Sequence, residues 1–293
     1  MKKKKSHSQK PKAAEILQPK KPNISDSDLN MLYRCGQQYY YRRKEGRKVP
    51  PGIAQIVGRA THESVHLDLQ TKIDTGQLRG AEEIADMARD EINGAWQAGI
   101  RLMPDELKEG QKKLKGEAVD LAVALSTLHH DNLAPIIKPV KVERFFRLDL
   151  EGYPMDLVGR IDIEEPDAIR DTKTAGKSPQ EDEAHMSDQL TIYALGVKAT
   201  TGKLPEKLYL DHLIKTKTPK VVTQSTERTE ADFKRIFRLI ERGIEVIDKE
   251  VFMPNPSGWW CSDRFCGYWA DICEFGRRKA VSIAVKEKLI GKK

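Results

Sequence analysis

The sequence predicts an α/β protein in which helices flank a mixed central sheet, and two observations carry that prediction. Short β-type runs separated by turn residues are concentrated in residues 140–174 and again in residues 208–225. Longer runs with apolar residues at helical spacing lie before and after these strands. No apolar run approaches the roughly 20 residues that span a bilayer, so we expect a soluble chain with one principal domain.

The helical runs follow in chain order. We predict a first ordered helix over residues 25–43, which a Ser-Asp-Ser sequence can cap, and a second helix around His62. Residues 75–135 contain two runs with helical periodicity and no residue group that suggests chemistry, so we predict a helical insertion there. A long apolar stripe at helical spacing begins near Thr229 and predicts a core helix, with Phe233, Ile236, Phe237, Ile240, Ile244 and Ile247 on its buried face.

Two of the predicted strands face each other across a turn. The runs Leu157–Ile163 and Ala168–Thr174 are separated by a Glu-Glu-Pro-Asp sequence, which predicts an antiparallel hairpin. In that pairing Asp162 lies opposite roughly Ile169. The other strands are expected at Val140–Leu150, Leu208–Ile214 and Val221–Ser225.

The hairpin carries three polar side chains on one face. Asp171 and Lys173 share the face of Asp162 because side chains alternate along a strand. Two converging carboxylates can hold a hard divalent cation that polarises a phosphate oxygen and activates water, while the lysine offsets developing charge. The group therefore suits a phosphodiesterase site, and an ordinary solvated hairpin face is the alternative.

Two helices add polar residues to this group. Gln189 and Tyr193 stand four residues apart on one face of a predicted helix, and His62 lies on another. The ordered set resembles the PD-(D/E)XK nuclease superfamily, in particular its RecB-like and Cas4-like exonucleases. The pattern of that family runs from a histidine helix through Gly-x-x-Asp and Asp-x-Lys to Gln-x-x-x-Tyr, matched here by His62, Gly159–Asp162, Asp171–Lys173 and Gln189–Tyr193.

The resemblance covers residues 24–275 and implies a restriction-endonuclease-like fold. It implies that one or two Mg²⁺ or Mn²⁺ ions are bound by His62, Asp162 and Asp171. It also implies that Lys173 is the catalytic lysine. Gln189 and Tyr193 would support the site or contact DNA. Glu143 resembles an acidic residue that is sometimes found in the preceding strand, although an exposed strand charge is the simpler interpretation.

The four cysteines form a second group. Cys261, Cys266 and Cys273 are clustered, whereas Cys35 lies far upstream. The lysine-rich start of the sequence shows no apolar signal segment, so we expect a reducing compartment and metal ligation rather than disulfides. Four thiolates can hold zinc or an iron–sulfur cluster, but zinc sites favour two close pairs. Unliganded thiols remain the third alternative.

The cysteine spacing also resembles that of Cas4-like and AddB-like nucleases, in which one distant cysteine and a trio hold a cluster. The resemblance implies a structural 4Fe–4S cluster in a segment over residues 255–275, bound by Cys35, Cys261, Cys266 and Cys273. The trio is more widely spaced here than is usual in those nucleases. We expect the neighbouring aromatic residues to shield the cluster, namely Trp259, Trp260, Tyr268 and Trp269.

A different enzyme class shares one motif with this chain. The sequence His62-Glu63-Ser64-Val65-His66 matches the H-E-x-x-H of zinc peptidases. No third ligand is evident, and the peptidase interpretation explains neither the Asp-x-Lys motif nor the cysteine trio. A partly buried helix histidine is the preferred interpretation of His66.

Charge divides the chain into three parts. We assign a basic tail to residues 1–22, the nuclease domain to residues 23–280 and a second basic tail to residues 281–293. Residues 1–21 contain eight lysines and one glutamate, so they account for the formal net charge of +7 of the whole chain. Such a composition predicts a disordered segment that either solubilises the protein or raises its affinity for DNA.

Because the rest of the chain is neutral overall, DNA contacts require local clusters of basic residues. One such cluster lies near Cys35 and is interleaved with three tyrosines, a pattern that suits a single-strand groove or a solvated helix face. It comprises Arg34, Arg42, Arg43, Lys44, Arg47 and Lys48, with Tyr39, Tyr40 and Tyr41.

These observations lead us to expect a metal-dependent exonuclease that degrades DNA from its ends, with single strands preferred. We expect it in the cytoplasm of a prokaryotic or phage-infected cell, in recombination, repair or DNA processing. No phosphate-cradling glycine loop is present, so an ATP-driven helicase would be a separate partner. An inactive DNA-binding or scaffold protein with the same fold is the alternative.

Overall fold

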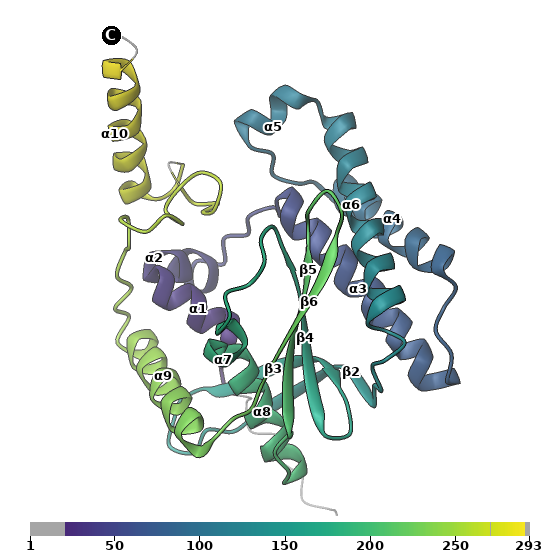
Figure 1. Ribbon diagram of the computed structural model, residues 1–293. Coiled ribbons are helices and arrows are strands. Elements are labelled where there is room, and N and C mark those ends of the chain that lie inside the picture. The colour runs from purple at the N-terminus through teal and green to yellow at the C-terminus, as the bar shows by residue number, and fades with distance from the viewer. Residues whose placement is uncertain (1–20, 270, 291–293) are drawn as a thin grey trace, which may run out of the picture.

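A six-stranded mixed sheet forms the centre of the computed structural model, which describes residues 21–269 and 271–290 (Figure 1). The α/β fold class is therefore confirmed. The strands are β1 (Asn23–Ser25), β2 (Lys141–Leu148), β3 (Asp156–Glu164), β4 (Ala168–Ala175), β5 (Lys207–Ile214) and β6 (Lys220–Thr226). The hydrogen-bonded order is β1-β3-β4-β5-β6. β1 and β4 pair with the same edge of β3, and β2 pairs with its opposite edge.

Helices cover both faces of this sheet. Helices α3, α4 and α6 pack on one face around an alanine- and leucine-rich core, and α1, α8 and α9 pack on the other face (Figure 1). In chain order the helices are α1 (Asp26–Arg34), α2 (Gly36–Tyr39), the π-helical turn η1 (Tyr40–Lys44), α3 (Ile53–Thr75), α4 (Ala81–Ala98), α5 (Pro104–Glu109), α6 (Gln111–Asn132), α7 (Glu183–Met186), α8 (Asp188–Thr201), α9 (Glu230–Asp248) and α10 (Glu274–Ile290).

Strand β3 pairs with three other strands. β2 runs antiparallel to it almost throughout, whereas β1 and β4 share its opposite edge. β1 pairs only at the start of β3, and β4 pairs only at Ile163 with Arg170 and at Glu164 with Ile169. The hydrogen-bonded ladder is therefore interrupted between these two neighbours. The two aspartates of the hairpin lie next to that interruption.

The predicted hairpin is confirmed, but its register is shifted by two residues. Ile169 lies opposite Glu164 instead of Asp162, because β3 extends through Glu164 and the turn is shorter than the sequence suggested. A hydrogen bond of 2.8 Å from the Glu165 backbone nitrogen to the Ala168 carbonyl closes this turn. Continued in the same register, Asp162 would lie opposite Asp171, which brings their carboxylates closer than the predicted diagonal pairing.

The first helix is shorter than predicted. It starts with a capping box between Ser25 and Asp28, but ends at Arg34, and Cys35 has an extended backbone. Gly36 explains the break, because a Cβ there would lie 2.7 Å from the Met253 backbone nitrogen of a crossing segment. The contact with this segment, which leads to the cysteine trio, prevents a continuous helix. Strand β1 was not predicted at all.

Helices α4, α5 and α6 occupy most of the region in which a helical insertion was predicted, and one of the predicted helices is divided. The predicted helix over residues 105–130 is divided into α5 and α6 at Gly110, whose φ of 89° is readily adopted only by glycine. On α9, Phe237 is 43% exposed, so its predicted place in the core stripe is wrong, whereas the other five residues of the stripe are buried.

The two predicted tails lie largely at or beyond the limits of the described residues. Of the basic segment 1–22, only Lys21 and Pro22 are described. Residues 281–290 continue helix α10, and residues 291–293 lie outside the described part. Within the described part of the chain, no helix combines the length and apolar character needed to cross a bilayer.

A buried histidine in α6 makes stability dependent on pH. His129 is fully buried, and neither ring nitrogen has a hydrogen-bond partner among the described residues. Burial, together with the charge of Arg170, lowers the pKa of His129 from 6.5 to about 3. In the unfolded chain the ring binds a proton near pH 6.5, so stability is lost as the pH falls from about 6.5 towards 3.

We therefore expect His129→Leu to stabilise the protein, and to do so more strongly in acid. The increase in the free energy of unfolding should be about 2 kcal/mol larger at pH 5 than at pH 7. This follows from 1.36 kcal/mol for each pH unit below the pKa of the unfolded histidine. Urea unfolding of both proteins at pH 7 and pH 5 measures it. His185→Leu, on an exposed position of α7, is the matched control and should show no such change. An equal effect of His129→Leu on the free energy of unfolding at both pH values would contradict the lowered pKa of His129.

Candidate active site

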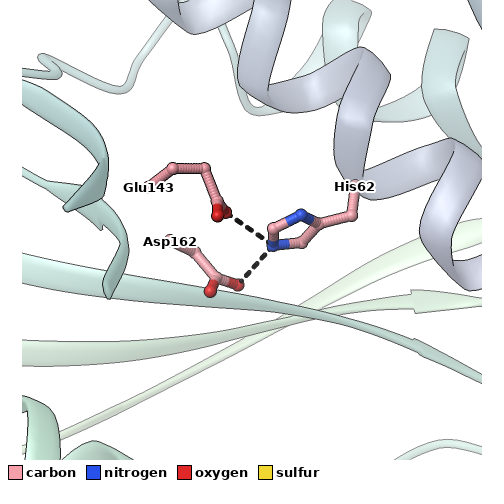
Figure 2. Close-up of side chains that lie close together, drawn as sticks. All are labelled: His62, Glu143 and Asp162. Carbon is pink, nitrogen blue, oxygen red and sulfur yellow. Dashed lines mark ion pairs between the residues drawn. The ribbon is translucent and has the colours of Figure 1, made fainter. Parts of the chain in front are cut away.

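Three side chains from α3, β2 and β3 converge over the sheet. The His62 Nε2 atom on α3 lies 3.1 Å from Asp162 Oδ2 on β3 and 3.3 Å from Glu143 Oε1 on β2 (Figure 2). Each of the three residues offers a ligand atom, and all these atoms lie within 4.8 Å of one another. All three residues are partly buried. The group therefore has the size and the donor types of a metal site.

Local backbone features allow this approach. Gly58, one turn before His62, packs over β4, and a Cβ there would lie 3.3 Å from Thr174 Oγ1. Glu143 has a φ of 50°, and the pairing between β2 and β3 is interrupted at this residue. A left-handed backbone at a non-glycine residue costs free energy and is concentrated at functional sites. It occurs here where the carboxylate meets His62.

A second group of polar side chains lies on β4 and α8, next to the first. Lys173 Nζ lies 2.8 Å from Asp171 Oδ2 and donates a 2.6 Å hydrogen bond to Gln189 Oε1. The amide of Gln189 in turn donates a 2.7 Å hydrogen bond to the Tyr193 hydroxyl. Asp162 accepts a 3.2 Å hydrogen bond from the Thr172 backbone nitrogen, which connects the two groups across the gap between β3 and β4.

The electrostatics of the site reflect a high density of buried carboxylates. Burial raises the pKa of Asp171 to about 7; the charge of Asp162 adds to this effect, and Lys173 opposes it. Burial also raises the pKa of Glu143 above its usual range. For His62, burial opposes protonation, but the hydrogen bond and charge of Asp162, with the charge of Glu143, raise the pKa to about 9. These carboxylates therefore favour a nearby positive charge.

Unpaired oxygen atoms show what the site can bind. Asp171 is fully buried, and neither of its carboxylate oxygens accepts a hydrogen bond within the described residues, although Lys173 lies close as a counter-charge. The Oε1 atom of Glu143 is likewise buried without a hydrogen bond from the described chain. Buried carboxylate oxygens without donors are costly unless a cation binds them. These residues therefore fit a hard divalent metal ion.

The structure brings together all six predicted site residues, but arranges them differently from the predicted ligand set. Glu143, not Asp171, completes the compact group with His62 and Asp162. Glu143 is therefore more than the exposed strand charge that the sequence favoured, because its position next to His62 depends on pairing between distant strands.

Asp26 was also missed by sequence reasoning. Its carboxylate, at the start of α1, has a pKa raised to about 6 by burial, and the charges of Lys173 and Asp188 act on it. The Asn30 amide donates a 2.8 Å hydrogen bond to it. Nothing in the local sequence distinguishes Asp26 from a helix-capping residue, since only the packing of α1 against α8 brings it near Lys173.

The peptidase interpretation does not agree with the geometry. His62 is directed at two carboxylates of the sheet, whereas His66 lies 3.9 Å from Glu63 on its own helix. Within the described residues, no candidate ligand group contains both histidines. The H-E-x-x-H spacing is therefore not used as a zinc motif here.

Sequence comparison identifies the family. A model of the PD-(D/E)XK nuclease superfamily matches residues 23–274, which is most of the chain. The chain belongs to this superfamily. The match contains both polar groups of the site, and nuclease function follows as the common activity of the family. No curated protein sequence matches the chain significantly.

Two solved structures resemble this superfamily member distantly. A protein of Eubacterium rectale that is named as a candidate exonuclease is 13% identical, with a TM-score of 0.49, and the likeness covers 82% of this chain and 86% of that one. The protein SSO0001 is 15% identical, with a TM-score of 0.41, over 89% of this chain and 90% of that one.

The four cysteines of this nuclease-family chain line one pocket between the start of α2 and the segment before α10. All are free thiols, and burial raises the pKa of Cys261 and of Cys266. In the described residues, no three of the sulfurs lie within 4.8 Å of one another. Tetrahedral zinc would require sulfurs about 3.8 Å apart, from a Zn–S bond of about 2.3 Å. The present spacing is therefore wider than a zinc site needs.

Two indole groups of the same pocket lack partners. The Nε1 atoms of Trp260 and Trp269 are buried without a hydrogen bond from the described residues. The Asn255 backbone nitrogen lies 3.4 Å from Cys35 Sγ as a donor. The pocket therefore combines four thiols with two indole N–H groups and one backbone N–H group.

Proposed function

We propose that this chain is a divalent-metal-dependent DNA exonuclease of the RecB-like and Cas4-like type. One observation carries the proposal: His62, Glu143 and Asp162 converge next to the buried Asp171, whose carboxylate is paired with Lys173 and accepts no other hydrogen bond within the described residues. Such a site combines cation ligands with a positioned ammonium group, the combination that phosphodiester hydrolysis requires.

Each residue has a distinct task in this proposal. His62, Glu143, Asp162 and Asp171 would hold Mg²⁺ or Mn²⁺, which when bound supplies Lewis-acid activation of the phosphate and of the attacking water. Lys173 is the catalytic lysine, which orients that water and offsets the charge that develops on the phosphate. Gln189 holds the lysine through its 2.6 Å hydrogen bond, and Tyr193 in turn holds Gln189.

We assign a structural 4Fe–4S cluster to Cys35, Cys261, Cys266 and Cys273. The common pocket, the spacing beyond that of zinc and the unpaired indole N–H groups support this assignment. A cluster there would connect the break after α1 to the segment that precedes α10. Its role is to stabilise that connection, at a distance from hydrolysis.

The proposal also covers the substrate and the cellular setting. We assign single-stranded DNA ends as the preferred substrate, in recombination, repair or DNA processing, with a separate helicase as a partner. The four cysteines form no disulfide in the described chain, as is typical of the reducing cytoplasm.

The test is degradation of end-labelled DNA by anaerobically purified protein. Linear single-stranded and duplex substrates, labelled at either end, are incubated with Mg²⁺ or Mn²⁺, with and without a chelator. We expect metal-dependent loss of label from linear single strands, while a closed circular single strand of the same sequence stays intact because it has no end.

Two outcomes would overturn the proposal. Cleavage of the circular strand at the same rate would replace the exonuclease with an endonuclease. DNA binding without cleavage in either metal would instead favour the inactive DNA-binding protein.

A further inference from the structure

A groove with a volume of about 700 Å³ lies between the N-terminal helices, the start of α3 and the cysteine segment. One wall comes from α1 and η1, and another from the start of α3 and the loop before it. The third wall combines two distant parts of the chain, the turn between α4 and α5 and the cysteine segment. The walls of the groove are therefore formed by segments that lie far apart in the sequence.

Helix α3 leads from this groove to the site. Gln55, in its first turn, lines the groove, Gly58 packs over Thr174, and His62 belongs to the candidate metal group. His62 follows Gln55 by seven residues, a rise of about 10 Å along the helix axis. Ser27 lines the opposite wall and follows Asp26, whose charge acts on Lys173. One end of the groove therefore lies about one and a half to two helical turns along α3 from His62.

The charge of the groove suits an anionic strand. Its walls carry five arginines and a single carboxylate, Glu106, which accepts a 2.7 Å hydrogen bond from the Met103 backbone nitrogen and caps α5. The arginines are Arg34, Arg42, Arg43, Arg101 and Arg264.

Two of these arginines are available to a ligand. Arg43, Arg101 and Arg264 pair with Asp28, Asp263 and Asp105 respectively. Arg34 donates only to the neutral amide of Gln38, and neither it nor Arg42 has a carboxylate within ion-pair distance in the described part of the chain. Arg42 is exposed in the groove. Unneutralised arginines are the usual contacts of phosphate groups.

The third wall is held together by two ion pairs. Arg101 Nη2 lies 2.7 Å from Asp263 Oδ1, and Arg264 Nη2 lies 2.5 Å from Asp105 Oδ2. Each of the two segments thus supplies one arginine and one aspartate to the contact. Phe265, beside Arg264, lines the groove, packs edge-to-face with Trp259 at 4.6 Å between ring centroids and is still 50% exposed. An exposed aromatic ring between cationic walls is the arrangement on which unpaired bases stack, whereas paired bases in a duplex have no free face.

We propose that this groove binds the single-stranded DNA end and guides it to the metal site. Arg34 and Arg42 bind successive backbone phosphates, and Phe265 stacks against a base. The proposal rests on the proposed nuclease function, because it takes DNA as the ligand, and it adds the residues that select a single strand.

The test measures DNA binding by fluorescence anisotropy, with a fluorescein-labelled thymidine 20-mer and a blunt 20-base-pair duplex as probes and a chelator present to prevent cleavage. The full chain is used after anaerobic purification. The double variant Arg34→Glu/Arg42→Glu should bind the 20-mer at least about tenfold more weakly. Its slope of log Kd against log salt should be smaller by about 0.7 for each lost phosphate contact. Phe265→Ala should weaken binding about fivefold or more.

Arg238→Glu is the matched control. Arg238 is an exposed arginine on α9 without a carboxylate partner in the described residues, and it lines a separate pocket against the loop after β2. Reversal of its charge should leave the affinity for the 20-mer within about twofold of wild type. Circular dichroism and the melting temperature of each variant check that the fold is retained.

The outcomes separate this proposal from the nuclease assignment. Wild-type affinity in the double variant, an equal loss in Arg238→Glu, or duplex binding as tight as that of the 20-mer would each overturn the groove assignment, whether or not the protein cleaves DNA. Selective weakening in a protein that cleaves no DNA under any condition would support the groove and overturn the nuclease function.

Discussion

Asp171→Asn should abolish DNA cleavage and leave the fold intact. The substitution keeps the shape of the side chain, and the native carboxyl has a pKa of about 7, so an uncharged group at this buried position is tolerated near neutral pH. Cleavage should fall by about 10³-fold or more, because a bound cation contributes several kcal/mol to the transition state and each 1.36 kcal/mol is tenfold in rate. Rates on an end-labelled single strand measure the loss.

A matched control lies in the same hairpin. Asp167 is exposed in the turn between β3 and β4, and Asp167→Asn should cleave at the wild-type rate because it makes the same chemical substitution outside the candidate metal group. Calorimetric titration with Mn²⁺ adds a readout independent of turnover, and Asp171→Asn should bind the ion more weakly than Asp167→Asn. Undiminished cleavage by Asp171→Asn, in protein of normal melting temperature, would remove Asp171 from the catalytic group.

Cys35→Ser should remove the proposed cluster and release the cysteine segment. Cys35 is the only cysteine outside the trio, and ligation to Cys261 would close a loop of more than 220 residues. Closing such a loop lowers the conformational entropy of the unfolded chain, which raises its free energy by about 5 kcal/mol in the chain-entropy model. The variant should therefore lose iron and melt at a lower temperature. Segment 249–273, whose described residues form no helix or strand, should also become sensitive to protease.

The measurement is iron and acid-labile sulfide per chain after anaerobic purification, together with the visible spectrum. Wild type should contain four of each, and Cys35→Ser should contain little of either. Ser262→Ala, within the same segment, is the control and should keep the cluster, since among the described residues its hydroxyl bonds only to the Trp259 carbonyl. A colourless wild-type protein loaded with zinc, or a Cys35→Ser variant with full iron content, would contradict the assignment.

The sequence predicted the polar groups of the site through short-range periodicity. Asp171 and Lys173 share a face because strands alternate, and Gln189 and Tyr193 share one because a helix repeats about every four residues. Both pairs lie in the structure as their spacing predicts, in one hydrogen-bonded chain.

Contacts between distant segments were harder to predict. Glu143 meets His62 only because β2 pairs with β3 and its backbone adopts a positive φ, and neither feature has a local signal. The break after Arg34 has the same origin, since the contact of Gly36 with the backbone of Met253 comes from a segment over 200 residues away.

The sequence by itself determined the α/β class, the hairpin and the side chains that face the site, because each depends on a period of two or about four residues along one element. The tertiary structure alone decided where β3 and β4 diverge, which carboxylates lie nearest His62, and that the insertion and the cysteine segment form one wall of a basic groove. These features depend on contacts between segments distant in the chain. Such contacts are set by the packing of whole elements against one another, and that packing leaves no repeat in the local sequence.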